Sequence, residues 1–129
     1  MSENEFESYR DTDEEYEVID GESLAGKILS IGRRGENGTQ TLRIDASALA
    51  ESLPGCELQI AVVRPNEQEV YLPTVTVADG VISWPILRSD LTQFGLGYGE
   101  VRAVKGDQVK KSAVFRTRIE FGLPGPDGE

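Results

Sequence analysis

The chain has 129 residues, of which 38% are apolar, and its formal net charge is −10, with one cysteine and no histidine. A lone cysteine excludes a disulfide framework, and the lack of histidine excludes a Cys/His zinc site and a Ser-His-Asp triad. No run approaches the ~20 consecutive apolar residues of a membrane-spanning helix, so we expect one soluble domain with no membrane partner.

The charge is concentrated at the start of the chain. Residues 1–22 contain ten acids and one base, a net −9, so the other 107 residues sum to only −1. The remainder therefore lacks the basic surface that binds nucleic acid. Residues 1–23 are predicted to be an acidic arm, disordered or ordered by a partner, and they do not have the pattern of a secretion signal. The arm is either a solubilising tail or a partner-binding segment that uses Phe6, Tyr9 and Tyr16.

Residues 24–121 alternate short apolar runs with turn residues, which predicts strands. The predicted strands are 28–34, 39–45, 57–62, 70–78, 82–86, 99–105 and 113–121. The sequence 35–38 predicts a hairpin turn, Asp79-Gly80 a second one, and residues 46–53 a short helical turn. Pro73 inside a predicted strand indicates an edge or a bulge.

This pattern predicts an all-β fold, an immunoglobulin-like antiparallel β-sandwich of about seven strands. A small closed barrel is the alternative. Trp84 is the expected centre of the core, with Phe115 and Phe121 as its neighbours.

The sequence offers little for catalysis or cofactor binding, so we expect neither an enzyme nor a cofactor or metal site. Cys56 is interpreted as a small buried hydrophobic residue. The glycines of residues 95–99 resemble a phosphate-binding loop, but a strand rather than a helix follows them. They are therefore predicted to form a loop between the sheets, with Tyr98 packed over it.

Basic residues gather near the end of the domain. They are Arg102, Lys105, Lys110, Lys111, Arg116 and Arg118. Arg116 and Arg118 share the outward face of the last predicted strand. The group is either an ordinary charged face or a patch that receives acidic arms, from its own chain or from a neighbour.

Glycine occupies every third position at the end of the sequence, at Gly122, Gly125 and Gly128. Both complete triplets contain proline, which is typical of a collagen-like triple helix. The alternative is a Pro/Gly-rich linker. The collagen interpretation predicts a homotrimer whose axis passes these glycines, and a shaft that continues beyond residue 129.

Residues 58–121 resemble the immunoglobulin-like N-terminal domain of phage baseplate upper proteins and related fibre proteins. The matching residues are Asp79-Gly80, Ile82, Trp84, Ile86, Asp90-Leu91, Gly95, Gly97, Glu100, Ser112, Phe115 and Ile119. The resemblance implies a structural protein of the virion, made in the cytoplasm of a bacterial host. The resemblance implies a base that holds a longer oligomeric fibre on the virion, and it implies no catalytic residue. The acidic arm and the collagen-like exit depart from that group and are more like a head fibre, so the partner is expected to be a capsid or a baseplate protein.

Two other functions remain open from the sequence. One is a sandwich that binds carbohydrate or a host receptor, with Tyr71 and Tyr98 as the exposed aromatic candidates. The other is a repeat of a bacterial surface adhesin.

Overall fold

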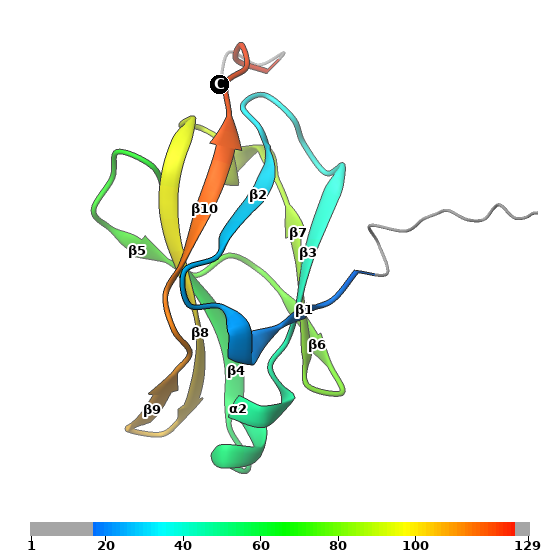
Figure 1. The fold of residues 1–129 in the computed structure, drawn as a ribbon, viewed down its shortest axis with the longest axis vertical. Coiled ribbons are helices and arrows are strands. Elements are labelled where there is room, and N and C mark those ends of the chain that lie inside the picture. Colours follow the sequence, from blue (N-terminus) through cyan, green and yellow to red (C-terminus); the bar gives the residue numbers. More distant parts are fainter. Residues whose placement is uncertain (1–16, 126–129) are drawn as a thin grey trace, which may run out of the picture.

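The computed structural model describes residues 17–125, which form two β-sheets packed face to face (Figure 1). Four strands form one sheet, in the order β1-β3-β7-β6; they are Ile19–Asp20, Gln40–Asp45, Val81–Ile86 and Thr76–Ala78. The other sheet has the order β2-β10-β8-β4-β5, with β9 also pairing β8. Its strands are Ile28–Arg33, Phe115–Glu120, Gly95–Lys105, Glu57–Val63, Val70–Tyr71 and Gln108–Lys111.

The predicted all-β sandwich is confirmed, and the two separate sheets exclude a closed barrel. Most of the described strand pairs are antiparallel, as predicted, but β1 pairs β3 and β10 pairs β2 in parallel, so both sheets are mixed. The described residues form ten strands rather than seven. Short β1, β5 and β9 are among the additions, and such short segments lack a clear alternation of apolar residues.

The turn between β2 and β3 explains the parallel pair. Residues 35–38 do not close a hairpin, since Arg34 N–H donates to Glu120 O and Gly38 N–H donates to Ile86 O. The two sides of the turn therefore belong to different sheets. Strand β2 consequently pairs with the last strand of the chain rather than with β3.

The predicted hairpin at Asp79-Gly80 joins β6 to β7. Both residues have positive φ, 54° and 79°, as a two-residue turn of this type requires. The predicted strand 70–78 is divided: β5 pairs β4 in one sheet, and β6 pairs β7 in the other. Pro73 lies in the crossover between them, where no backbone N–H is needed for a ladder.

The predicted helical turn is the helix α2, Ser47–Ser52, and two 3-10 turns, η1 (Gly21–Ser23) and η2 (Arg88–Asp90), complete the fold. The predicted arm ends earlier than residue 23. Ile19–Asp20 pairs with β3, η1 follows directly, and Leu24 is fully buried. Residues 19–23 therefore belong to the sandwich.

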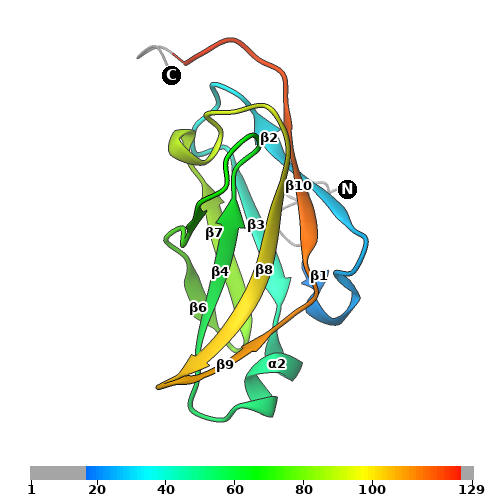
Figure 2. The ribbon, with the colours of Figure 1, turned by 90° about the vertical axis from the view of Figure 1, so that its left-hand side faces the viewer.

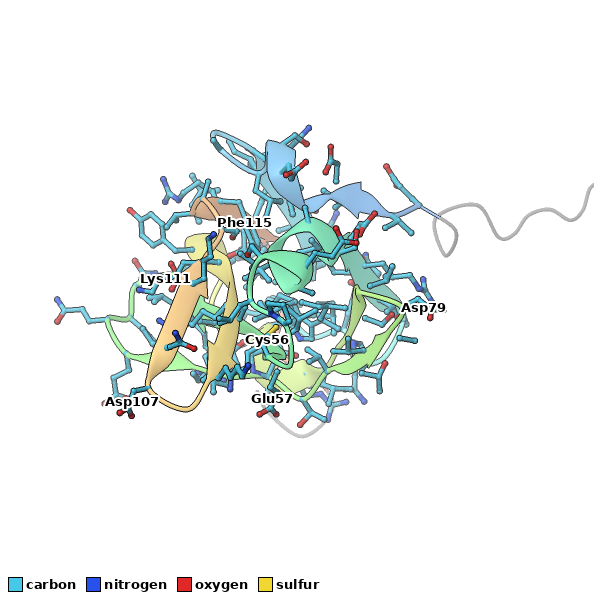
Figure 3. All side chains as sticks on the ribbon, turned by 90° about the horizontal axis from the view of Figure 1, so that it is seen from below. Cys56, Glu57, Asp79, Asp107, Lys111 and Phe115 are labelled. Atoms are coloured by element: carbon cyan, nitrogen blue, oxygen red, sulfur yellow. The ribbon has the colours of Figure 1, made fainter. Side chains whose placement is uncertain are left out.

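The core fills the space between the sheets, and Trp84, its predicted centre, is the largest of its fully buried side chains. Phe115 is also buried there, whereas Phe121 is 60% exposed and lies beyond the end of β10. Phe121 is therefore not a core neighbour of Trp84. Cys56 is half-buried against the core, and Figure 3 shows it between the turns at Asp79 and Asp107.

Candidate interaction surfaces

Four of the predicted basic residues share the outer face of the six-stranded sheet, which Figure 2 views from the side of β8 and β4. Inward residues of β8 and β10 are buried in alternation, so Arg102, Arg116 and Arg118 point outward. Lys111 of β9 pairs with Arg102 across the strands and faces the same way. Alternation in the sequence predicted the shared outward face of Arg116 and Arg118; the positions of Arg102 and Lys111 on the same face come from the strand pairing.

Glu100 organises one part of this face. Its Oε2 accepts a 2.7 Å bond from Nε of Arg102, two residues along β8. The Nζ of Lys111 lies 3.4 Å from the same oxygen. Glu100 is mostly shielded from solvent by these partners, so one carboxylate faces two cations.

Arg116 organises the opposite side. Its Nε donates a 2.9 Å hydrogen bond to the carbonyl of Gly97, and its guanidinium lies 4.2 Å from the centre of the Tyr98 ring. The ring of Tyr98 is 47% exposed. Within residues 17–125, neither Arg116 nor Arg118 has a carboxylate at ion-pair distance.

An apolar depression of about 340 Å³ lies between these two groups, and we call it the outer hollow. Its lining consists of Ala61, Val63, Val70, Tyr98, Gly99, Glu100, Arg102 and Val114. Ala61 has no bulky side chain to fill the space, while Val70 and Val114 stand exposed at its sides. The sequence signal for this feature was weak, because its residues come from four separate strands and loops.

The glycines of residues 95–99 lie inside β8, and the prediction of a loop there is wrong. A Cβ on Gly97 would meet the carbonyl oxygen of Val63, and a Cβ on Gly99 would lie 2.6 Å from the Phe115 ring. These positions need glycine because other strands approach closely. The contacting residues are distant in sequence, so the local pattern could not reveal this reason.

Two predicted basic residues lie elsewhere. Lys110 pairs across from the inward-facing Ala103 and lines a depression with Glu22 and Asp45, away from the outer hollow. Lys105 donates from Nζ to the carbonyl of Pro54 at 2.8 Å. Neither contributes to the face that carries Arg116.

A second apolar surface lies where the chain leaves the sandwich after β10, at the top of Figure 1. We call it the exit end; its exposed residues are Leu87, Phe94, Phe121 and Leu123. The rings of Phe94 and Phe121 pack edge to face, with centroids 5.2 Å apart and an interplanar angle of 84°. This contact orders two aromatic side chains that both remain open to solvent.

The glycines predicted to lie on a trimer axis have contacts inside the chain. A Cβ on Gly122 would meet the carbonyl oxygen of Arg34, and one on Gly125 would lie 2.9 Å from Nε of Arg88. Nη1 of Arg33 donates to the carbonyl of Phe121 at 2.8 Å. Residues 122–125 thus pack across the end of the sandwich. Gly128 lies outside the described residues, as do Phe6, Tyr9 and Tyr16 of the arm.

The sequence pattern does not reveal the contact between Tyr71 and Asp90. Tyr71, expected to be an exposed aromatic, is half-buried, and its hydroxyl donates to the buried carboxylate of Asp90 at 2.7 Å. Burial, followed by this hydrogen bond and the charge of Asp90, raises the pKa of Tyr71 well above its usual range. Tyr98 is therefore the exposed tyrosine of the two predicted candidates.

Residues 17–125 contain no group of three or more Cys, Asp or Glu side chains placed to hold a metal ion. The same residues include no helix of the length and apolarity needed to cross a membrane.

The fold has a counterpart of known structure, described as the N-terminal domain of phage TP901-1 ORF48. The two share a TM-score of 0.52 and 8% sequence identity, and the match covers 80% of this chain and 94% of that chain. At this identity the likeness concerns the fold. No protein-family model matches the chain, and no curated protein matches it in sequence.

Proposed function

We propose that this chain is a structural attachment module of a bacteriophage virion, the base of a trimeric fibre. Two separate lines support the proposal. The sequence between residues 58 and 121 resembles the N-terminal domains of phage baseplate and fibre proteins. The fold, compared without regard to sequence, is similar to the N-terminal domain of a phage protein.

The observation that best supports the proposal is the exposed apolar surface of the exit end. A shaft of three parallel chains requires its three bases to meet around one axis near the point where the chains leave them. Phe121 and Leu123 are 60% and 76% exposed at that point, beside the exposed Phe94. Exposed apolar side chains gathered at one place mark a contact surface rather than ordinary scattered residues.

In this proposal residues 122–125 stay packed on the end of the sandwich, and the three-chain shaft continues from Gly125 onward. The contacts of Gly122 and Gly125 with Arg34 and Arg88 hold the segment across the end of its own sandwich. A capsid or baseplate protein would bind the opposite end or a sheet face. The proposal assigns the chain no catalytic step and no cofactor.

Sedimentation equilibrium of the chain tests the trimer. We expect the average mass to rise with concentration toward that of three chains. Phe121→Ser should raise the apparent dissociation constant at least about tenfold, the effect of ~1.4 kcal/mol of lost contact. Val109→Ser is the matched control, because Val109 is similarly exposed, at 53%, but lies on β9. A single-chain mass at every concentration would contradict the trimer.

The place in the virion needs a separate experiment. Antibodies raised against the sandwich should label purified particles of the phage that encodes the chain, at the capsid or at the baseplate. Absence of label from intact and from disrupted particles would contradict a virion role.

A function in carbohydrate or receptor binding is the second candidate, and one observation favours it. Tyr98 offers an exposed ring beside an apolar depression, although Arg116 lies over that ring. Since Tyr71 is turned inward to Asp90, only Tyr98 of these two tyrosines is exposed on this surface. A glycan array without signal would exclude the carbohydrate alternative.

A further inference from the structure

The outer hollow has the composition of a peptide-binding site. Its floor and walls are almost wholly apolar, formed by Ala61, Val63, Val70 and Val114 with the ring of Tyr98. Single exposed apolar residues are normal on any protein, but here they are contiguous and concave. The hollow is therefore suited to one apolar or aromatic side chain.

The surroundings of the hollow are cationic. Arg102 and Lys111 stand on one side, both next to the carboxylate of Glu100, and Arg116 stands on the other side. Arg118 continues the positive charge along β10. An occupant that combines an aromatic ring with flanking carboxylates matches both the hollow and its charged border.

We propose that residues 1–16 of this same chain bind in the outer hollow. This segment has seven acids and one base, and its aromatic residues are Phe6, Tyr9 and Tyr16. Phe6 stands directly between Glu5 and Glu7, so an aromatic side chain and two carboxylates enter together. The inference goes beyond the proposed function, since it requires only one copy of the chain.

The first described residues lie close enough to the outer hollow for Phe6 to reach it. Glu17 and Ile19 line the same surface depression as Ser30 of β2, so the arm joins the sandwich at the β2 edge. From β2 the sheet continues through β10 to β8 and β4, which border the hollow. At about 4.8 Å per strand the separation is roughly 10–15 Å. Ten residues can span about 33 Å, so Phe6 can reach the hollow.

For single chains in solution, tethering distinguishes this arm from the arm of another copy. A short flexible linker gives an effective concentration in the millimolar range. Chains in solution at micromolar concentration meet each other's arms far less often. A weak contact of one aromatic residue and a few charges therefore favours the chain's own arm.

The first test compares amide chemical shifts of the full chain with those of a variant that lacks residues 1–16. We expect differences confined to the border and floor of the hollow, at Ala61, Val63, Tyr98, Arg102 and Val114. Phe6→Ser should reproduce most of these differences, whereas Thr12→Ser, a change elsewhere in the arm, should not. Identical spectra of the full and shortened chains would overturn the proposal.

The second test identifies whose arm is bound. A spin label attached at Ser8→Cys, in a chain that also carries Cys56→Ser, should broaden the amides of the hollow. The broadening should persist on dilution and should weaken at about 1 M salt, where the screening length falls to ~3 Å. Broadening seen only between a labelled chain and an unlabelled one would overturn binding of the chain's own arm.

Sedimentation of the same samples separates this inference from the trimer. A three-chain mass with no effect of the arm on the hollow overturns the inference and leaves the proposed fibre base intact. A single-chain mass with the expected shifts and broadening supports the inference and contradicts the trimer.

Discussion

The hydroxyl of Tyr71 donates a 2.7 Å hydrogen bond to Oδ1 of Asp90, a residue 19 positions further along the chain. The other oxygen of this carboxylate accepts from Nε1 of Trp84 at 3.3 Å and from the backbone N–H of Leu87 at 2.9 Å. Tyr71 belongs to the six-stranded sheet and Trp84 to the four-stranded one. Asp90 therefore links the two layers through a single buried side chain.

Removing the carboxylate of Asp90 should lower the stability of the fold. Asp90→Ala leaves the Tyr71 hydroxyl, the Trp84 indole and one backbone N–H without their acceptor. Because each unsatisfied buried group costs about 1–3 kcal/mol, we expect the free energy of unfolding in urea to fall by at least ~3 kcal/mol. Asp90→Asn should cost less, since one acceptor oxygen remains. Glu51→Ala, an exposed change on α2, should stay within about 0.5 kcal/mol. A loss below about 1 kcal/mol for Asp90→Ala would contradict this account.

Stability should also depend on the ionisation of Tyr71 at high pH. Burial and the bond to Asp90 raise the pKa of Tyr71 above its ordinary value of 10.0. The unfolded chain therefore loses this proton first, and above pH ~10 the unfolded state binds fewer protons than the folded state. The contribution of the protonated Tyr71 hydroxyl to the free energy of unfolding is complete below that pH. Above it, this contribution declines by up to about 1.4 kcal/mol per pH unit.

Comparison with Tyr71→Phe isolates this effect, because the ionisation of lysines and other tyrosines is common to both chains. The difference in unfolding free energy between the two should shrink as the pH rises above about 10. Parallel stability curves through the alkaline range would show that Tyr71 ionises equally well in the folded chain.

Local patterns predicted the parts of the fold that local physics determines. Strand β4 was recognised by its alternation, and the turn at Asp79-Gly80 by residues that tolerate positive φ. The shared outward face of Arg116 and Arg118 also followed from alternation. In each of these cases a residue's role is set by neighbours a few positions away.

The failures concern roles set by distant partners. The exposed strand β9 has no alternation, because all four of its residues face solvent. Phe121 has the inward parity of β10, but the strand ends at Glu120. Tyr71 finds its acceptor in a residue of η2. Such pairings depend on tertiary packing, which a single sequence does not display.

Gly99 provides a test of one such hidden contact. An alanine Cβ there would lie 2.6 Å from Cζ of Phe115, inside the packed core. We expect Gly99→Ala to lower the free energy of unfolding by about 1–3 kcal/mol, as overpacking does. In a Phe115→Leu chain the same change should cost less, so the two substitutions should couple in a double-mutant cycle.

Gly26→Ala is the control for backbone conformation alone. Gly26 has a φ of 76°, but a Cβ there meets nothing within 4 Å. Its cost should be about 1 kcal/mol or slightly more, from the left-handed conformation, and should not change with Phe115→Leu. Equal cost of Gly99→Ala in both backgrounds would mean that Phe115 is not the obstacle.

The terminal glycines have two possible explanations, a place on the axis of a triple helix or close packing against their own sandwich. Substitution of Gly122 can separate them. A Cβ there would meet the carbonyl oxygen of Arg34 and lie 2.8 Å from Cγ of Arg33. Gly122→Ala should therefore detach the exit segment from its own sandwich, even in a single chain. The amide of Arg34, which donates to Glu120 O, should then exchange with solvent about tenfold faster, the equivalent of ~1.4 kcal/mol.

Leu123→Ala is the matched control, because Leu123 is 76% exposed and its truncation removes little packing. Hydrogen exchange should be measured at a concentration where sedimentation gives a single-chain mass. If Gly122→Ala leaves the Arg34 amide unchanged there, yet weakens association at high concentration, the glycine serves contact between chains. If exchange accelerates in the single chain, close packing against Arg33 and Arg34 is sufficient reason for glycine, and its place in the Gly-x-y series carries no separate information about a triple helix.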